Sequence, residues 1–126
     1  MSDVEICRVP AALAPAAWPD LAPLLAPAIE RSCGRHTLAT TLERLRNADA
    51  LALAGLRDAR PIMACVVQVA LYPAQRWLQV PFCGGADMAA WLEPLLGEIH
   101  TVAYDQHCFG VEISGRGGWQ RVLRDY

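Results

Sequence analysis

Three apolar segments in the middle of the chain, joined by two short polar connections, most constrain the fold. They occupy residues 51–56, 62–72 and 77–83, and the connections are 57–60 and 73–76. Apolar runs of this length bounded by turn residues are typical of strands, and connections this short join antiparallel neighbours. The middle segment is apolar on both faces, which places it in the centre of a sheet. The sequence therefore predicts an antiparallel meander.

The N-terminal part predicts one strand followed by a helix that contains prolines. Residues 4–9 alternate between apolar and polar side chains and end at Pro10, which suits a half-buried strand. From residue 18 to 31 the apolar residues keep helical spacing, but Pro23 and Pro27 would each remove a backbone hydrogen bond, at about 3 kcal/mol in a helix interior. We expect a kinked helix or two short helical pieces.

Two further helices, a last strand and a final helix complete the expected order. Thr37 can cap a helix that ends near Asn47, and Asp87 can cap another after Gly84-Gly85 has ended the meander. Residues 110–114 alternate like a strand, which a helical crossover would place parallel to its predecessor. The order β-α-α-β-β-β-α-β-α predicts an α/β (α+β) protein with a mixed sheet of about five strands and helices on both faces.

Composition indicates a single domain spanning residues 1–126. The chain is 54% hydrophobic, and its 11 basic and 13 acidic residues give a net charge of -2, which offers no electrostatic footprint for nucleic acid or an anionic membrane. Its five cysteines lack CxxC spacing, so they are interpreted as small core residues of a protein in a reducing compartment. With no signal pattern and no apolar run long enough to span a bilayer, a cytoplasmic location is expected.

The order of elements, with glycines after the fourth strand and a strand-helix unit at the end, resembles the GNAT superfamily of N-acetyltransferases over nearly the whole chain. Residues 111–126, VEISGRGGWQRVLRDY, are similar to the ending of small tailed-phage and prophage proteins labelled GNAT-like, through a Gly-Arg-x-Gly-Trp core. GNAT folds continue after this helix with two more strands. The resemblance therefore implies a GNAT-like sheet that lacks its last two strands and exposes the edge of strand five.

The resemblance also implies where acetyl-CoA would be held. GNAT enzymes bind its pyrophosphate through backbone N–H groups of a Gln/Arg-x-x-Gly-x-Gly/Ala loop after strand four. Gly84, Gly85 and Ala86 are the candidate cofactor-binding residues in this chain. No Arg or Gln precedes them at the required spacing, and Asp87 adds a negative charge where the pyrophosphate would go. The expectation is that the chain uses no cofactor, with acetyl-CoA as the alternative.

A second comparison concerns the final strand-helix unit, where GNAT enzymes carry an Asn, an Ala three residues later and a general-acid Tyr four beyond that. The spacing places Arg116, Trp119 and Leu123 at these positions. A Leu cannot donate a proton. Tyr126 stands three residues late and would face another direction on a helix. The resemblance therefore leaves the general acid unmatched.

Other reactive side chains give weak candidates. Glu112 and His107 are the nearby residues that could act as a base, with a structural role preferred for both, and Cys83 is the candidate nucleophile because it precedes a helix N-terminus. His107 with His100 and Cys108 could suggest a metal site, but the spacing matches no known ligand pattern. No metal is predicted.

From these observations we expect a non-catalytic, degenerate GNAT-like protein that serves as a structural or assembly component of a phage virion or prophage. It would contact a protein partner, or a second copy of itself, through the strand-five edge, with Glu112, Arg116, Trp119 and Tyr126 at the interface. The location would be the host cytoplasm or the virion. The alternative is a CoA-dependent N-acyltransferase of the GNAT superfamily with an atypical phosphate loop.

Overall fold

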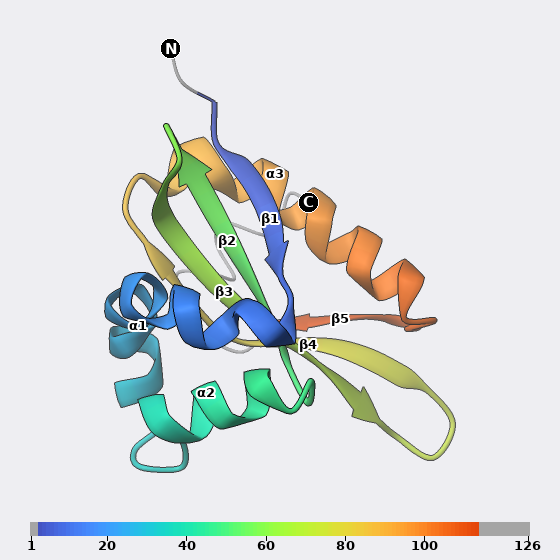
Figure 1. Cartoon of the computed structure of the whole chain (residues 1–126). Coiled ribbons are helices and arrows are strands. Elements are labelled where there is room, and N and C mark those ends of the chain that lie inside the picture. Colours follow the sequence, from blue (N-terminus) through green and yellow to red (C-terminus); the bar gives the residue numbers. More distant parts are fainter. Residues whose placement is uncertain (1–2, 114–126) are drawn as a thin grey trace.

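A computed structural model describes residues 3–113 of the chain (Figure 1). The predicted last helix, with Arg116, Trp119, Leu123 and Tyr126, lies outside the described residues. The elements follow the predicted order as far as the fifth strand, with a short 3-10 helix added before the first helix. They are β1 (Glu5–Val9), η1 (Ala11–Leu13), α1 (Ala14–Glu30), α2 (Leu38–Arg46), β2 (Leu51–Arg57), β3 (Arg60–Leu71), β4 (Arg76–Gly85), α3 (Met88–Asp105) and β5 (Gly110–Ile113).

One mixed sheet of five strands contains every strand, in the order β1-β2-β3-β4-β5. The pairs β1–β2, β2–β3 and β3–β4 are antiparallel, and β4–β5 is parallel because α3 carries the chain back across the sheet. The predictions of a meander, a central β3 and a parallel last strand are all confirmed.

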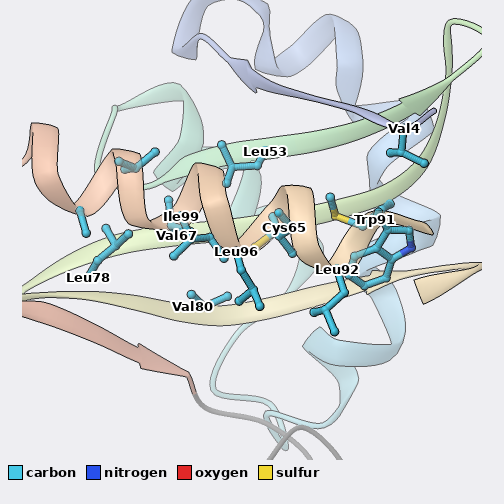
Figure 2. Close-up of a cluster of buried hydrophobic side chains, with 14 residues drawn as sticks. Val4, Leu53, Cys65, Val67, Leu78, Val80, Trp91, Leu92, Leu96 and Ile99 are labelled. Carbon is cyan, nitrogen blue, oxygen red and sulfur yellow. The ribbon is translucent and has the colours of Figure 1, made fainter. Parts of the chain in front are cut away.

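Each face of the sheet buries its own apolar cluster. Along β3, Met63, Cys65 and Val67 pack with α3, whereas Ala64 and Val66 pack with α1 and α2. Figure 1 shows α1 and α2 on one face and α3 on the other, and Figure 2 shows the α3-side cluster. A strand covered on both faces has to be apolar at successive positions, which is the pattern seen in the sequence.

Helix α1 is one helix of 17 residues, so the prediction of two separate pieces is wrong. Its ribbon changes direction along its length in Figure 1, in agreement with the predicted kink. Pro19, Pro23 and Pro27 lie inside it and are all exposed, whereas Leu21 and Leu25 are buried. Because the prolines share the solvent face, water can satisfy the carbonyls that they leave unpaired.

The start of α2 matches its prediction in detail. The side-chain oxygen of Thr37 accepts from the backbone N–H of Thr40 at 3.0 Å, and that of Thr40 accepts from the N–H of Thr37 at 2.8 Å. This reciprocal capping satisfies two amides that the helix itself cannot pair. Asn47 follows the last helical residue, as expected.

Strand β4 ends at Gly84-Gly85 as predicted, but both glycines still pair with β3, two residues beyond the predicted strand end at residue 83. A Cβ on Gly84 would overlap the carbonyl oxygen of Leu24 in α1, and a Cβ on Gly85 would overlap the carbonyl oxygen of Ile62. Glycine is therefore required here by the close approach of α1 and β3. Within residues 3–113, no helix is long and apolar enough to cross a membrane.

Candidate functional site

Within the described residues, β5 pairs with only the first part of β4. The pairs run from Trp77–Gly110 to Val80–Ile113, where the described part of the chain ends, and the next residue of β4, Pro81, has no N–H to donate. The β3–β4 register also shifts between Val66 and Gln68, where β4 takes three steps for two of β3. This extra residue is a β-bulge, which bends a strand and ends pairing.

Beyond the bulge, residues 81–85 of β4 turn backbone polar groups toward a gap, which is the side on which β5 pairs with the earlier part of the strand. The N–H of Ala86 donates to the carbonyl of Ile62 at 3.0 Å, which makes this a hydrogen-bonded pair of the β3–β4 ladder. Because such pairs alternate along antiparallel strands, Cys83 and Gly85 do not bond to β3. Their N–H and C=O groups face the gap, where the described residues provide no strand partner.

The N-terminus of α3 lies at the end of this strand. Asp87 is in the capping position with φ 61° and ψ 53°, but its side chain makes no capping hydrogen bond. The carboxylate instead accepts from Nη2 of Arg57 at 2.8 Å. The first amides of α3 are thus left without a side-chain cap, and the helix dipole adds partial positive charge there. This is the arrangement that binds anions at helix N-termini.

Arg57 provides a positive charge next to Gly84, Gly85 and Ala86, although no Arg precedes these residues at the spacing of the GNAT loop. It lies at the end of β2, and its Nε is buried with no hydrogen-bond partner among the described groups. Strands β2 and β4 both run antiparallel to β3, so their C-terminal ends meet at the same end of the sheet. The predicted meander already implies that the ends of β2 and β4 lie together, and so it could have indicated that Arg57 is near the loop. The spacing of residues within the loop could not.

A row of polar side chains crosses β3, β4 and β5 on the face opposite α3. Gln68 donates to Gln79 at 3.0 Å, and Gln79 donates to Glu112 at 3.1 Å. The hydroxyl of Tyr72 lies 3.1 Å from both carboxylate oxygens of Glu112. This hydrogen bond, with a smaller contribution from desolvation, raises the pKa of Tyr72 above its ordinary value. Glu112 is therefore a carboxylate oriented by neutral donors, one residue before the last described residue of β5.

His36 is a second titratable residue that the structure brings to the bulge. It lies in the connection between α1 and α2, and its ring meets the ring of Phe82 edge to face, with the centroids 5.2 Å apart. The Ser32 hydroxyl accepts from the His36 backbone N–H at 3.1 Å and so helps to fix the connection. Phe82 directly follows Pro81, so His36 lies on the α1–α2 face beside the gap. In the sequence this segment indicated only a break between helices.

The remaining predicted site residues are not all brought together. Cys83 packs its side chain into the α3-side cluster, where the thiol of Cys65 is its neighbour, and no base contacts it among the described side chains. Ala86 uses its N–H on Ile62. His107 is exposed between α3 and β5, at the opposite end of β4 from the gap. No group of three metal-binding side chains occurs in residues 3–113.

No model of a known protein family and no curated protein sequence matches this chain. Solved structures do match. A structure described as a probable acetyltransferase has a TM-score of 0.75 at 16% identity, over 97% of this chain and 88% of that one. Ribosomal-protein-alanine N-acetyltransferase from Brucella melitensis biovar Abortus 2308 has a TM-score of 0.65 at 15% identity, over 98% and 87%. A predicted acetyltransferase from Clostridium acetobutylicum, solved with acetyl-CoA, has a TM-score of 0.68 at 8% identity, over 98% and 88%.

The protein has the GNAT-like fold that the sequence resemblance implied. The comparisons contradict the prediction of a non-catalytic assembly component, because these similar structures are acetyltransferases. They also contradict the prediction that no cofactor is used, since one of them was solved with acetyl-CoA. The specific similarity to phage proteins, the cytoplasmic or virion location and the partner at the strand-five edge stay predictions.

Proposed function

We propose that this protein is a CoA-dependent N-acyltransferase that transfers an acyl group to an amine. One observation carries the proposal: β4 continues through the Pro81 bulge past its last described pair with β5, and this edge, unpaired among residues 3–113, leads directly to an uncapped helix N-terminus. The edge suits an extended chain with amide groups, and the helix end suits phosphates. The similarity in fold to acetyltransferases supports the same activity.

The residues present fit acetyl-CoA. The backbone groups of Cys83 and Gly85 would bond to its amide-containing arm, and the first amides of α3, at Met88 and Ala89, would face its phosphates. Arg57 would add positive charge, and its unpartnered Nε gives it an unused donor. The negative charge of Asp87, which had argued against the cofactor, is balanced by Arg57. When bound, acetyl-CoA supplies an activated acyl thioester.

Glu112 is the proposed general base. An amine attacks a thioester carbonyl only as the neutral species, so a group beside the gap has to accept its proton. Tyr72 and Gln79 hold the Glu112 carboxylate in one orientation and leave its other lone pairs free for the amine. His36 lies beside Phe82 on the same face of the sheet and is the second residue proposed to contact the acceptor.

An acyl-transfer assay tests this proposal. We expect the protein to release free CoA thiol from acetyl-CoA when supplied with a primary amine, in a panel containing a polyamine, a peptide with a free N-terminus and an aminoglycoside. Glu112→Gln should lower kcat by roughly 10²- to 10⁴-fold, because the amide cannot accept the proton. Glu93→Gln, on the exposed side of α3, is the matched control and should be unaffected.

The two parts of the proposal fail separately. The absence of thiol release with every amine would contradict the activity. Full activity in Glu112→Gln would remove Glu112 from the mechanism and leave the activity standing.

A further inference from the structure

We propose that Cys65 and Cys83 form a dithiol site that reacts with small disulfides, such as oxidised glutathione, and closes to a protein disulfide. The proposal does not rest on acyl transfer, although Cys83 belongs to both proposed sites, with its backbone in one and its thiol in the other. All five cysteines are free thiols in the structure.

The sheet register places these two cysteines directly opposite each other. Cys65 of β3 pairs with Cys83 of β4. The hydrogen bond from Ala86 N–H to the Ile62 carbonyl marks a hydrogen-bonded pair, and three steps along the ladder the Cys65–Cys83 pair is a non-hydrogen-bonded one. In such pairs the Cα atoms lie about 4.5 Å apart and the side chains approach most closely. This spacing is within the range that a disulfide spans.

Both thiols also point to the same side of the sheet. Cys65 is fully buried in the cluster beneath α3, as Figure 2 shows, and Cys83 packs against the same cluster. The neighbouring Cys83 thiol, together with burial, raises the pKa of Cys65 well above its ordinary value. Cys65 is thus held protonated and inaccessible, and a reagent has to react first at Cys83, which is partly exposed.

The unequal exposure sets the order of the exchange. The Cys83 thiolate attacks one sulfur of the small disulfide, which forms a mixed disulfide and releases one thiolate. That thiolate takes up the proton that Cys83 lost. The Cys65 thiol then attacks the Cys83 sulfur, and its proton goes to the second small thiolate as that thiolate leaves. The balance is one protein dithiol and one small disulfide giving one protein disulfide and two small thiols.

The other cysteines have no such partner. Cys7 lies opposite Ala54 in the sheet, Cys33 is exposed between α1 and α2, and Cys108 lies between α3 and β5. They provide internal controls. On a thiol that no second thiol can reach, the reaction with a small disulfide stops at the mixed-disulfide adduct.

Mass spectrometry of the folded protein tests the proposal. After incubation with oxidised glutathione, alkylation of free thiols and digestion with trypsin, which cuts at Arg76, we expect a disulfide that joins the peptide of Cys65 to that of Cys83. Fragmentation distinguishes Cys83 from Cys108 in the second peptide. The linked species should be lighter than the dithiol by about 2 Da and should return to it with dithiothreitol.

Two variants make the result specific. Cys83→Ser should abolish the link and leave Cys65 unmodified, whereas Cys33→Ser should leave the link intact. The proposal is overturned if wild-type Cys83 keeps a stable glutathione adduct, if Cys83 stays alkylatable, or if the link forms only in denaturant. Acetyl-CoA is absent from every sample, so failure of the acyltransferase proposal would not affect the outcome.

Discussion

Arg57 and Asp87 form an ion pair of 2.8 Å that joins the end of β2 to the start of α3. The pair places a guanidinium next to a helix N-terminus that carries no side-chain cap. It also draws the Asp87 carboxylate away from capping the helix. The proposed anion-binding site therefore combines two segments of the chain that strands β3 and β4 separate in the sequence.

Removal of this cation should weaken cofactor binding. We expect Arg57→Ala to raise the Kd for acetyl-CoA about tenfold, since it removes a charged donor and leaves the Asp87 carboxylate unpaired at the phosphate site. Both side chains are partly exposed, so the effect should shrink as salt concentration rises. Arg60→Ala, in the same hairpin, is the control and should change the Kd less than twofold. Equal effects of the two substitutions would contradict the site.

A pair of glycine substitutions tests the packing of α1. Gly84→Ala should destabilise the protein by about 2 kcal/mol or more, because its methyl group would overlap the backbone carbonyl of Leu24. Gly97→Ala in α3 meets no atom within 4 Å and should stabilise by about 0.5–1 kcal/mol. Urea unfolding curves measure both. If Gly84→Ala were as well tolerated as Gly97→Ala, α1 could not approach β4 as closely as described.

The Tyr72–Glu112 contact predicts a pH effect. Ionisation of Tyr72 would remove a donor and set two negative charges together, so the pKa of Tyr72 is raised in the folded protein. A raised folded pKa contributes stability below the unfolded pKa of about 10, and this contribution is lost as pH rises through the folded value. Phenolate absorbance of wild type minus Tyr72→Phe should give a midpoint above about 10. Glu112→Gln should lower this midpoint, and Glu93→Gln should not.

Most of the fold could be predicted from local patterns. Alternating strands, short connections and the Thr37 cap each depend on neighbours in sequence, and these features are confirmed. The sequence predicts that Gly84 helps to end the meander, but it does not show why a glycine is required at this position. Its requirement arises from Leu24, which no local pattern connects to it. Close approaches between distant backbones cannot be recognised from one sequence.

The candidate site was predicted only in part. Glu112 was identified as a base candidate, and the structure adds the donors that orient it. Arg57 and His36 were missed because each reaches the site through tertiary contacts, from a hairpin and from a loop. The prediction of no cofactor depends on the missing Arg or Gln before the glycines and on the charge of Asp87, taken without its ion-pair partner. The net charge around a loop can be judged only when the positions of all the elements that pack against it are known.

Calorimetric titration with acetyl-CoA is the measurement that tests the central claim most directly. The account predicts saturable binding at one site per chain, and a thermal stabilisation equivalent to about 2.7 kcal/mol when the ligand is a hundredfold above its Kd. Binding should weaken in Arg57→Ala and persist in Arg60→Ala. The absence of both heat and thermal stabilisation at millimolar acetyl-CoA, with the protein folded by circular dichroism, would contradict the proposal that this protein is a CoA-dependent acyltransferase.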